Sequence, residues 1–354
     1  MATLDIGQDT ASLTAALVDI YSESGHEKEV ADAVEVALRA LGHLAVDRAG
    51  DAIVARSSWG GRERVVLAGH LDTVPPADNL PSRREGGILH GLGTADMKGG
   101  IAIMLRLAAA VTSASRDVTY VFYDGEEVEA ERNGLLRLTR EHPDWLASDF
   151  AVLLEPTDAI VEGGCQGTMR VDVHVPGERA HSARSWMGEN AIHAAGVVLD
   201  RLRAYEPRRP MVDGLEYREG LNAVGIRGGV AGNVVPGECV VTVNYRFAPD
   251  RSPDEAEEHL RDVFVGFDVT VTDSAAGARP GLQHPAAQAF AAAIGGTPRA
   301  KFGWTDVALF SALGVPAVNY GPGDPHVAHT AGEWVSAAQL SECEEHLHAW
   351  LTTT

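Results

Sequence analysis

The sequence predicts an α/β protein in which a smaller inserted domain interrupts a larger one. Up to residue 166, short apolar runs without alternation are separated by helical patterns, which is typical of strands covered on both faces. Between residues 169 and 175 apolar and polar side chains alternate, as in a half-exposed antiparallel strand. Apolar runs separated by helical patterns return after residue 280. We therefore expect a discontinuous domain over 1–166 and 281–354 and an inserted domain over 167–280.

The first part of the larger domain begins with a helix over 28–41. Four apolar residues recur there at helical spacing, namely Val30, Val34, Leu38 and Leu41. Gly42 follows as the expected C-terminal stop. Apolar runs that suit buried strands come at 65–69, 118–123 and 150–154, with a helix over 97–111 between the first two.

The inserted region has the predicted order β-α-β-β-α-β. After the alternating strand we expect a helix over 192–202, strands at 222–229 and 238–246, a helix over 254–264 and a strand at 267–272. This order favours a small open sheet with two helices on one face, which leaves an edge and a face available for pairing. The larger domain then returns with helices over 285–293 and 305–313, an apolar run at 315–320 and a last helix over 336–351.

Length and composition exclude several classes of protein. A chain of 354 residues exceeds the usual single core, which favours two domains or an insertion. The formal net charge of -21 would repel nucleic acid and anionic lipid, and no basic stripe compensates for it. The N-terminal stretch MATLDIGQDTASL has no basic segment followed by an apolar one, and no run of about 18 apolar residues occurs. We expect a cytoplasmic protein that binds neither nucleic acid nor membrane.

Cysteine usage indicates which metal ligands the chain could offer. Cys165, Cys239 and Cys343 are the three cysteines, and they lack CxxC spacing. This pattern predicts neither a disulfide framework nor a thiolate zinc site. A metal site would therefore use histidine and carboxylate ligands.

Ionisable side chains gather where the predicted strands end. Ligands of open α/β sheets bind beyond the carboxyl ends of the strands, so these positions point to a common site. The residues concerned are His70, Asp72, Asp96, Glu126, Glu127, Glu155 and His329.

Each of these residues, taken alone, also has a structural explanation. A lone His70 suits a hydrogen-bonded core histidine, Asp96 stands where a helix N-cap would stand, and Glu126–Glu127 suits a solvated turn. Their shared position at strand ends favours a joint role instead. Two histidines and at least three carboxylates suit two divalent ions such as zinc, with one carboxylate bridging.

Six segments of the chain resemble motifs of one family, the two-zinc aminoacylase and carboxypeptidase family of amidohydrolases. Five of them occur in the family's order across nearly the whole chain: GHLDTVP, GLGTADMKGG, DGEEVE, LLEPTD and the late HTAGE. The sixth, GERAHSARSWMGENAIH, is similar to a stretch of the family's dimerisation domain. The resemblance implies a zinc-peptidase-like α/β catalytic domain with an inserted ferredoxin-like dimerisation or lid domain, and a homodimer.

The resemblance also implies two bound Zn²⁺ ions, for which Co²⁺ could substitute. His70 and Glu155 would hold one ion, Glu127 and His329 would hold the second, and Asp96 would bridge the two. Among the late histidines, the family pattern of a histidine followed closely by a glutamate favours His329 over His326, because Glu333 follows His329.

Two further acidic residues acquire roles from the same resemblance. Asp72 would orient His70 by accepting from its other ring nitrogen. Glu126 would be the general base, taking a proton from a water that the two ions activate and passing it to the leaving amine.

The inserted domain would complete the site. His181 is similar to the family histidine that reaches the partner protomer's site and stabilises the tetrahedral oxyanion, although a solvent-exposed loop histidine is the competing interpretation. Asn233 and Arg246 match positions that hold a substrate carboxylate, and for Arg246 a solvated arginine competes.

Within the family, the segments YDGEEVEAERNGL, GTADMKGG and FGWTDVALF resemble the desuccinylases that cleave N-succinyl-LL-2,6-diaminopimelate. Thr305 in the last segment is a candidate substrate contact. Arg184 and Asp324 depart from that subfamily, which often carries Tyr and Asn at these places. An arginine can still bind a carboxylate, so the expected partner remains a small N-acyl diamino acid.

Two other functions compete with this interpretation. N-acetylornithine deacetylase, or another N-acyl-amino-acid hydrolase or carboxypeptidase of the family, would need a small acyl pocket and no cation for a distal carboxylate. A non-enzymatic metal-binding homodimer is the alternative from a different class. Glu126 argues against that alternative, because it ligates no metal in this interpretation and a protein that only binds metal has no chemical need for it.

Overall fold

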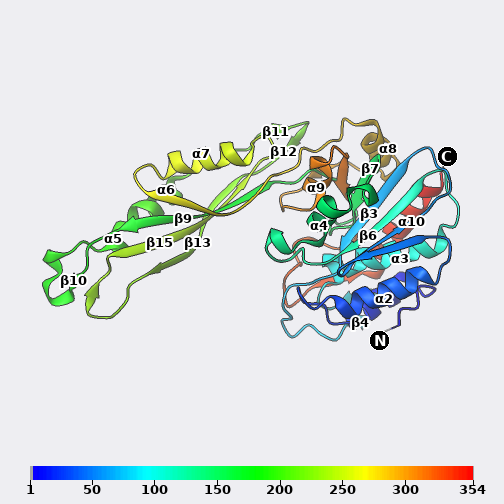
Figure 1. The fold of residues 1–354 in the computed structure, drawn as a ribbon, viewed down its shortest axis with the longest axis horizontal. Coiled ribbons are helices and arrows are strands. Elements are labelled where there is room, and N and C mark those ends of the chain that lie inside the picture. The colour runs from blue at the N-terminus through cyan, green and yellow to red at the C-terminus, as the bar shows by residue number, and fades with distance from the viewer. Residues whose placement is uncertain (1–2, 354) are drawn as a thin grey trace. The chain divides into compact units, whose positions relative to one another are not determined.

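The computed structural model describes residues 3–353, which form two compact units (Figure 1). Unit 1 takes the chain up to Gly163, Gly281–Arg299 and the chain from Leu309 onward, and unit 2 takes Gly164–Pro280 and Ala300–Ala308. The segment 300–308 belongs to unit 2, where the Trp304 indole N–H donates to the carbonyl of Ala276 (3.0 Å). None of the described helices is both long and apolar enough to cross a membrane.

Unit 1 is built on a mixed eight-stranded sheet. In sheet order its strands are β1 (Ala45–Ala49), β2 (Ala52–Arg56), β6 (Asp117–Tyr123), β3 (Arg64–His70), β7 (Phe150–Leu153), β18 (Ala317–Asn319), β8 (Glu162–Gly163) and β17 (Arg299–Ala300). The central strands β6, β3, β7 and β18 run parallel to their neighbours in that group. Nearly every residue of β3, β6 and β7 is buried, which confirms strands covered on both faces.

Helices cover this sheet and close a large apolar core. The helices outside the inserted region are α1 (Thr10–Val18), α2 (Lys28–Arg39), α3 (Gly99–Ala110), α4 (Gly134–Glu141), α8 (Pro285–Ile294), α9 (Val307–Ala312) and α10 (Ala337–Thr352). Residues of α1, α2, α3, α8 and α10 share one core with the sheet. A small sheet, β19 (Trp334–Ser336), β5 (Ile88–His90) and β4 (Arg83–Glu85), joins two segments far apart in sequence.

The order of elements in unit 2 confirms the predicted β-α-β-β-α-β. Its elements are β9 (Gly167–Pro176), α5 (Ala191–Ala194), α6 (Gly196–Ala204), β13 (Gly220–Gly228), β15 (Glu238–Phe247), α7 (Pro253–Val263) and β16 (Asp268–Ala275). The sheet order is β13-β15-β9-β16 with antiparallel neighbours. The helix expected over 192–202 is divided at Ala195, just before Gly196, a residue type that weakens helices.

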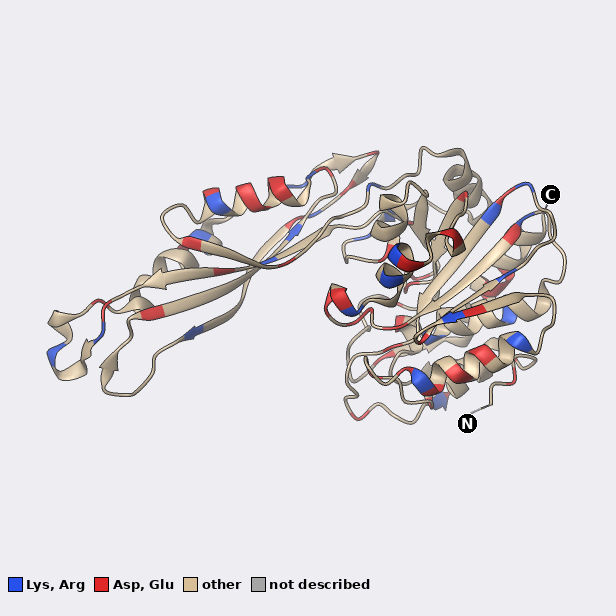
Figure 2. Ribbon diagram, viewed as in Figure 1, with Lys and Arg blue, Asp and Glu red and all other residues tan. Residues whose placement is uncertain are grey.

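Alternation along β9 decides which face of the unit 2 sheet is covered. Met169, Val171, Val173 and Val175 are at most 1% exposed and pack with α5, α6 and α7, while Arg170 on the other face is exposed. Helix α7 begins at a capping box formed by Ser252 and Glu255, and acidic residues recur along it (Figure 2). Short pairs β10 (Ala180–His181) with β14 (Val234–Val235), and β11 (Met211–Val212) with β12 (Leu215–Glu216), complete the unit.

Candidate metal centre

The candidate site lies at the carboxyl ends of the parallel strands of unit 1. His70 is the last residue of β3, Glu126 and Glu127 follow the end of β6, and Glu155 follows the end of β7. Because these strands are parallel neighbours, their ends meet at one edge of the sheet. Asp96 reaches the same edge from the irregular turn η1 (Thr94–Lys98), which leads into α3.

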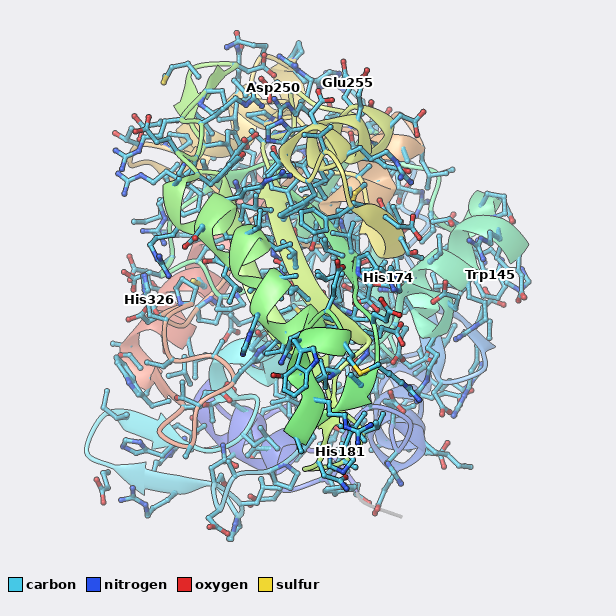
Figure 3. All side chains as sticks on the ribbon, turned by 90° about the vertical axis from the view of Figure 1, so that its left-hand side faces the viewer. Trp145, His174, His181, Asp250, Glu255 and His326 are labelled. Atoms are coloured by element: carbon cyan, nitrogen blue, oxygen red, sulfur yellow. The ribbon has the colours of Figure 1, made fainter. Side chains whose placement is uncertain are left out.

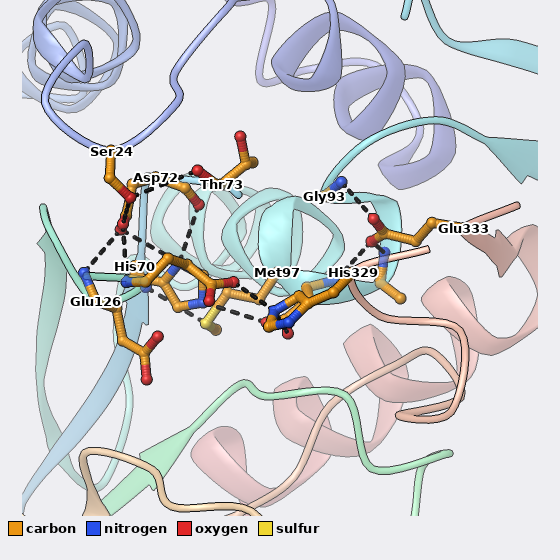
Figure 4. Close-up of polar contacts among 12 residues, drawn as sticks. Ser24, His70, Asp72, Thr73, Gly93, Met97, Glu126, His329 and Glu333 are labelled. Carbon is orange, nitrogen blue, oxygen red and sulfur yellow. Dashed lines mark hydrogen bonds and ion pairs between the residues drawn. The ribbon is translucent and has the colours of Figure 1, made fainter. Parts of the chain in front are cut away.

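Asp96 lies between two imidazoles. Its Oδ1 is 3.2 Å from His70 Nε2, and its Oδ2 is 3.3 Å from His329 Nε2 (Figure 4). The same nitrogen of His329 is 2.8 Å from Glu127 Oε1. His70, Asp96 and Glu127 each offer a ligand atom within 4.8 Å of the others. One carboxylate with an oxygen toward each histidine is the arrangement that a bridging ligand requires.

Two predicted ligands are not part of this compact group. Among the described residues, the group with all ligand atoms within 4.8 Å includes neither Glu155, which is 5% exposed just beyond β7, nor His329, although His329 contacts Asp96 and Glu127. Of the two late histidines, His329 is the one that reaches Asp96 and Glu127, whereas His326 pairs with Asp324 (2.7 Å). His329 has a φ of 61°, a left-handed conformation that is uncommon outside glycine and is found at functional sites.

Asp72 makes contacts beyond the one with His70 that the sequence predicted. The Nδ1 of His70 is 3.4 Å from Asp72 Oδ1 and 3.0 Å from the Asp72 carbonyl oxygen. The fully buried carboxylate also accepts from the backbone N–H groups of Glu126 and Glu127, both at 3.0 Å, and from the Ser24 hydroxyl at 2.7 Å. One carboxylate therefore fixes a candidate ligand on β3 and the two glutamates after β6.

The imidazoles and carboxylates of this group stabilise each other's charged forms. Hydrogen bonds to Asp96 and Glu127 raise the pKa of His329 to about 11. Burial acts to lower the pKa of His70, but hydrogen bonds to Asp72 and Asp96 outweigh burial and hold that pKa well above its usual value. Burial acts to raise the pKa of Asp96, but the hydrogen bonds of His329 and His70 prevail and lower it.

The chemistry of this donor set fits a divalent metal. The carboxylates require positive charge at the two imidazoles, and a cation bound to the same nitrogen and oxygen atoms would provide it while displacing the protons. Imidazole and carboxylate groups are among the donors that bind zinc and other divalent metals. His70, Asp96, Glu127 and His329 would hold the ion or ions from this side of the sheet.

Two residues that contact Asp72 or Asp96 were given no role from the sequence. Ser24 donates to Asp72 from a loop 48 positions away, and no local pattern marks it. Glu333 accepts from the backbone N–H groups of Gly93, Ala95 and Asp96. Burial raises the pKa of Glu333 to about 7 against these hydrogen bonds, which lower it. Its place in the HTAGE segment was the one available signal.

The other predicted site residues belong to unit 2. His181 ends β10 and is exposed at one end of that unit (Figures 1 and 3), and the backbone N–H of Ser182 donates to the carbonyl of Asn233 (2.9 Å). The fold thus brings His181 and Asn233 together. Arg246 lies opposite Thr168 in the register of β15 and β9. Thr305 is only 3% exposed, and its carbonyl accepts from the Cys165 thiol (3.5 Å).

Residues 66–353 match Peptidase family M20/M25/M40. The chain belongs to this family. It is 56% identical over 351 residues to a Mycobacterium tuberculosis protein that carries a provisional assignment as succinyl-diaminopimelate desuccinylase, with 98% of this chain and 99% of that protein covered. It is 45% identical over 360 residues to the succinyl-diaminopimelate desuccinylase of Corynebacterium glutamicum, with 99% and 98% covered. The family resemblance predicted from the motifs is therefore confirmed.

Solved structures share the fold of this M20/M25/M40 family member. A tripeptidase from Staphylococcus aureus superposes with a TM-score of 0.79 at 21% identity, covering 99% of this chain and 98% of that one. A metallo-carboxypeptidase of family M20 from Sulfolobus solfataricus superposes with a TM-score of 0.75 at 14% identity, covering 97% and 98%. These similarities confirm the predicted architecture of an α/β domain with an inserted α+β domain.

Proposed function

We propose that this protein hydrolyses N-succinyl-LL-2,6-diaminopimelate to succinate and LL-2,6-diaminopimelate in the cytoplasm. The observation that carries the proposal is the full-length identity of 56% and 45% to proteins assigned to that reaction, in a chain that groups His70, Asp96 and Glu127 at one sheet edge. Free Cys165, Cys239 and Cys343, all buried, agree with a reducing compartment.

The proposed cofactors are two Zn²⁺ ions, replaceable by Co²⁺. His70 and Glu155 would hold one ion, Glu127 and His329 the other, with Asp96 shared between them. The two oxygens of Asp96, one facing each histidine, support this assignment. When bound, such ions polarise the scissile carbonyl and lower the pKa of an attacking water.

Glu126 is the proposed general base. Its carboxylate would take a proton from the attacking water and deliver it to the nitrogen of the leaving amine. The backbone of Glu126 is anchored because its N–H donates to Asp72 Oδ1 (3.0 Å), and its charge is near enough to contribute to the raised pKa of His70. Asp72 would thus position the base, Glu127 and His70 together.

His181 is proposed to stabilise the oxyanion in the site of a partner subunit. The backbone N–H of Ala183 donates to His181 Nδ1 (3.0 Å). Because Nδ1 accepts, the proton of the neutral ring must be on Nε2, and this N–H can donate to a developing oxyanion. The exposure of this ring is also what a contact in trans would require.

A homodimer formed through unit 2 would bring that histidine to its partner. Strand β13 is at the edge of the unit 2 sheet and is exposed along most of its length. Several large apolar side chains of this unit are more than half exposed, namely Trp186, Met187, Val224, Ile226 and Val230. Val224 and Ile226 lie on β13 itself, and exposed apolar residues on an edge strand favour pairing with a second copy, so we assign unit 2 as the dimerisation and lid domain.

Mixing two inactive variants tests the shared site. Neither His181→Ala nor Glu126→Gln should be active alone, but heterodimers formed by mixing contain one site with both intact residues. Activity should therefore return on mixing. No recovery, with heterodimers verified by differently tagged subunits, would contradict a site that His181 completes in trans.

Arg246 is the proposed contact to a substrate carboxylate, with Asn233 and Thr305 as further contacts. In the part of the chain that the structure describes, the guanidinium of Arg246 makes no hydrogen bond or ion pair, although it is only half-exposed. Burial, and then the nearby charge of Arg170, lower its pKa. An anion bound there would relieve both penalties, as a substrate with several carboxylates would do.

Acetylornithine deacetylase is the second candidate, supported by 30% identity over 324 residues to the enzyme of Myxococcus xanthus, with 86% of this chain and 83% of that protein covered. A parallel assay on the purified zinc-loaded protein decides between the two. We expect rapid release of succinate from succinyl-diaminopimelate and little hydrolysis of N-acetylornithine. The reverse preference would refute the proposed substrate but would not contradict the proposed metal centre.

A further inference from the structure

One buried carboxylate ties the loop that carries Asp96 to the segment that carries His329. Glu333 is 2% exposed, and its Oε1 accepts from the N–H groups of Ala95 (2.9 Å) and Asp96 (3.0 Å). Its Oε2 accepts from the N–H of Gly93 (2.9 Å), and its carbonyl oxygen accepts from the N–H of Gly91 (3.1 Å). Figure 4 shows this carboxylate facing the loop rather than the group around His70.

The loop depends on this acceptor for its conformation. Gly93 has a left-handed φ of 76°, and Asp96 has φ -118° and ψ 93°, so the turn from Thr94 to Lys98 is not a regular helix start. In a regular helix start, a side chain from within the segment would cap the free N–H groups. Here the N–H groups converge on a residue 237 positions away from Asp96.

Glu333 is also close in sequence to His329, the second imidazole beside Asp96. His329 lies four positions before Glu333 and has a φ of 61°. Directly after Glu333, β19 pairs with β5, with Trp334 opposite His90. Glu333 therefore lies between β19, which is paired with β5, and His329. The Nε2 of His329 is 3.3 Å from Asp96 Oδ2.

Burying a carboxylate is unfavourable unless hydrogen bonds compensate for the lost hydration. Three backbone N–H groups compensate for part of that loss here, and no step of the proposed reaction uses this side chain. We propose that Glu333 is a positioning residue of the metal centre, which fixes Asp96 and His329 relative to each other before a metal binds. The inference rests on the metal centre of the proposed function but not on the identity of the substrate.

Glu333→Gln tests this inference through metal affinity. The amide keeps one oxygen, but its NH₂ group must face a backbone N–H that the carboxylate now accepts from. We expect zinc to bind ~10–100-fold more weakly, the usual scale for losing a group that orients metal ligands. Chelator competition measures the zinc dissociation constant, and the visible absorption of the Co²⁺-loaded variant reports whether the ligand arrangement has changed.

Asp117→Asn is the matched control. Asp117 is a carboxylate of unit 1, 9% exposed, that accepts from the backbone N–H of Trp59 (2.6 Å), and it begins β6 at the opposite end of that strand. Its variant should lower the melting temperature of the metal-free protein without changing zinc affinity. If Glu333→Gln also lowers the melting temperature while its zinc affinity stays within twofold of wild type, Glu333 is structural only and the inference is wrong.

Amide hydrogen exchange in the wild-type protein covers the case in which Glu333→Gln does not fold. In metal-free protein the N–H groups of Gly93, Ala95 and Asp96 should exchange slowly, because Glu333 holds them before metal binds. If these amides exchange as fast as those of exposed loops and become protected only when zinc is added, the metal organises the loop and Glu333 does not.

Discussion

Asp72→Asn is the substitution whose effect the structure specifies most closely. In the carboxylate, Oδ1 serves the Glu126 N–H and faces His70, while Oδ2 serves the Glu127 N–H and the Ser24 hydroxyl. The amide has one oxygen for these two positions. The oxygen should take the Oδ1 position, because the Ser24 hydroxyl can rotate to accept from an NH₂ group at the other position, whereas a backbone N–H cannot.

The expected result is that the N–H of Glu127 loses its acceptor while that of Glu126 keeps it. A hydrogen bond to a charged group contributes about 1.5–3 kcal/mol, so the free energy of unfolding should fall by about that amount. Because Glu127 is a proposed ligand and His70 loses the charge beside its Nδ1, zinc affinity and kcat/KM should each fall ~10–100-fold. A tenfold fall in zinc affinity or in kcat/KM corresponds to about 1.4 kcal/mol.

Three measurements separate these effects. Urea unfolding of the metal-free protein gives the change in stability, chelator competition gives the zinc dissociation constant, and succinate release gives kcat/KM at saturating zinc. Ser24→Ala is the matched control, because it removes one donor to the charged Asp72 and leaves both backbone N–H contacts; we expect it to cost about 1.5–3 kcal/mol with no loss of zinc affinity. An Asp72→Asn protein with wild-type zinc affinity and kcat/KM would refute this account of Asp72.

Three further substitutions have defined outcomes. Glu126→Gln should retain zinc content, measured by metal analysis, and lose at least ~10²-fold in kcat because proton transfer is lost; full activity would eliminate it as the base. Arg246→Gln should raise the KM of the succinylated substrate ~10-fold or more, since a charge-assisted bond to a carboxylate is removed; an unchanged KM would exclude that contact. Burial acts to raise the pKa of Asp172, but Arg227 and Thr242 outweigh it and lower the pKa from its ordinary value of 3.8. The stabilisation is therefore present above that pH and lost as pH falls through the lower folded-state pKa, so wild type and Asp172→Asn should differ in urea midpoint at neutral pH and converge in acid.

The longer strands and helices of this fold could be predicted from the sequence, whereas several short elements could not. Regular elements follow from hydrophobic patterning: the continuous apolar run at 118–123 is β6 (Asp117–Tyr123), which is buried throughout, and the alternation at 169–175 is β9 (Gly167–Pro176). Periodic patterns can be recognised because burial repeats every two residues in a half-exposed strand and every three to four in a helix. The short strands β4 and β5, and the division of the helix over 192–202, had no periodic signal long enough to detect.

The sequence by itself determined the kinds of donor and their place at strand ends. His70 and Glu127 carry imidazole and carboxylate groups just where parallel strands of an α/β sheet finish, Asp96 lies in the turn before a helix, and His329 lies in a late loop. The order of the motifs identified the family. These features depend only on short stretches of sequence, so they can be recognised without knowledge of the fold.

Only the tertiary structure decided how these donors are held. It places the two oxygens of Asp96 toward two different histidines, and it shows Asp72 accepting from the backbone of Glu126 and Glu127. It also reveals that Glu333 accepts from backbone N–H groups of the loop that carries Asp96. The physical reason is that hydrogen bonds between loops far apart in the chain, 237 residues in the last case, leave no periodic trace in either segment.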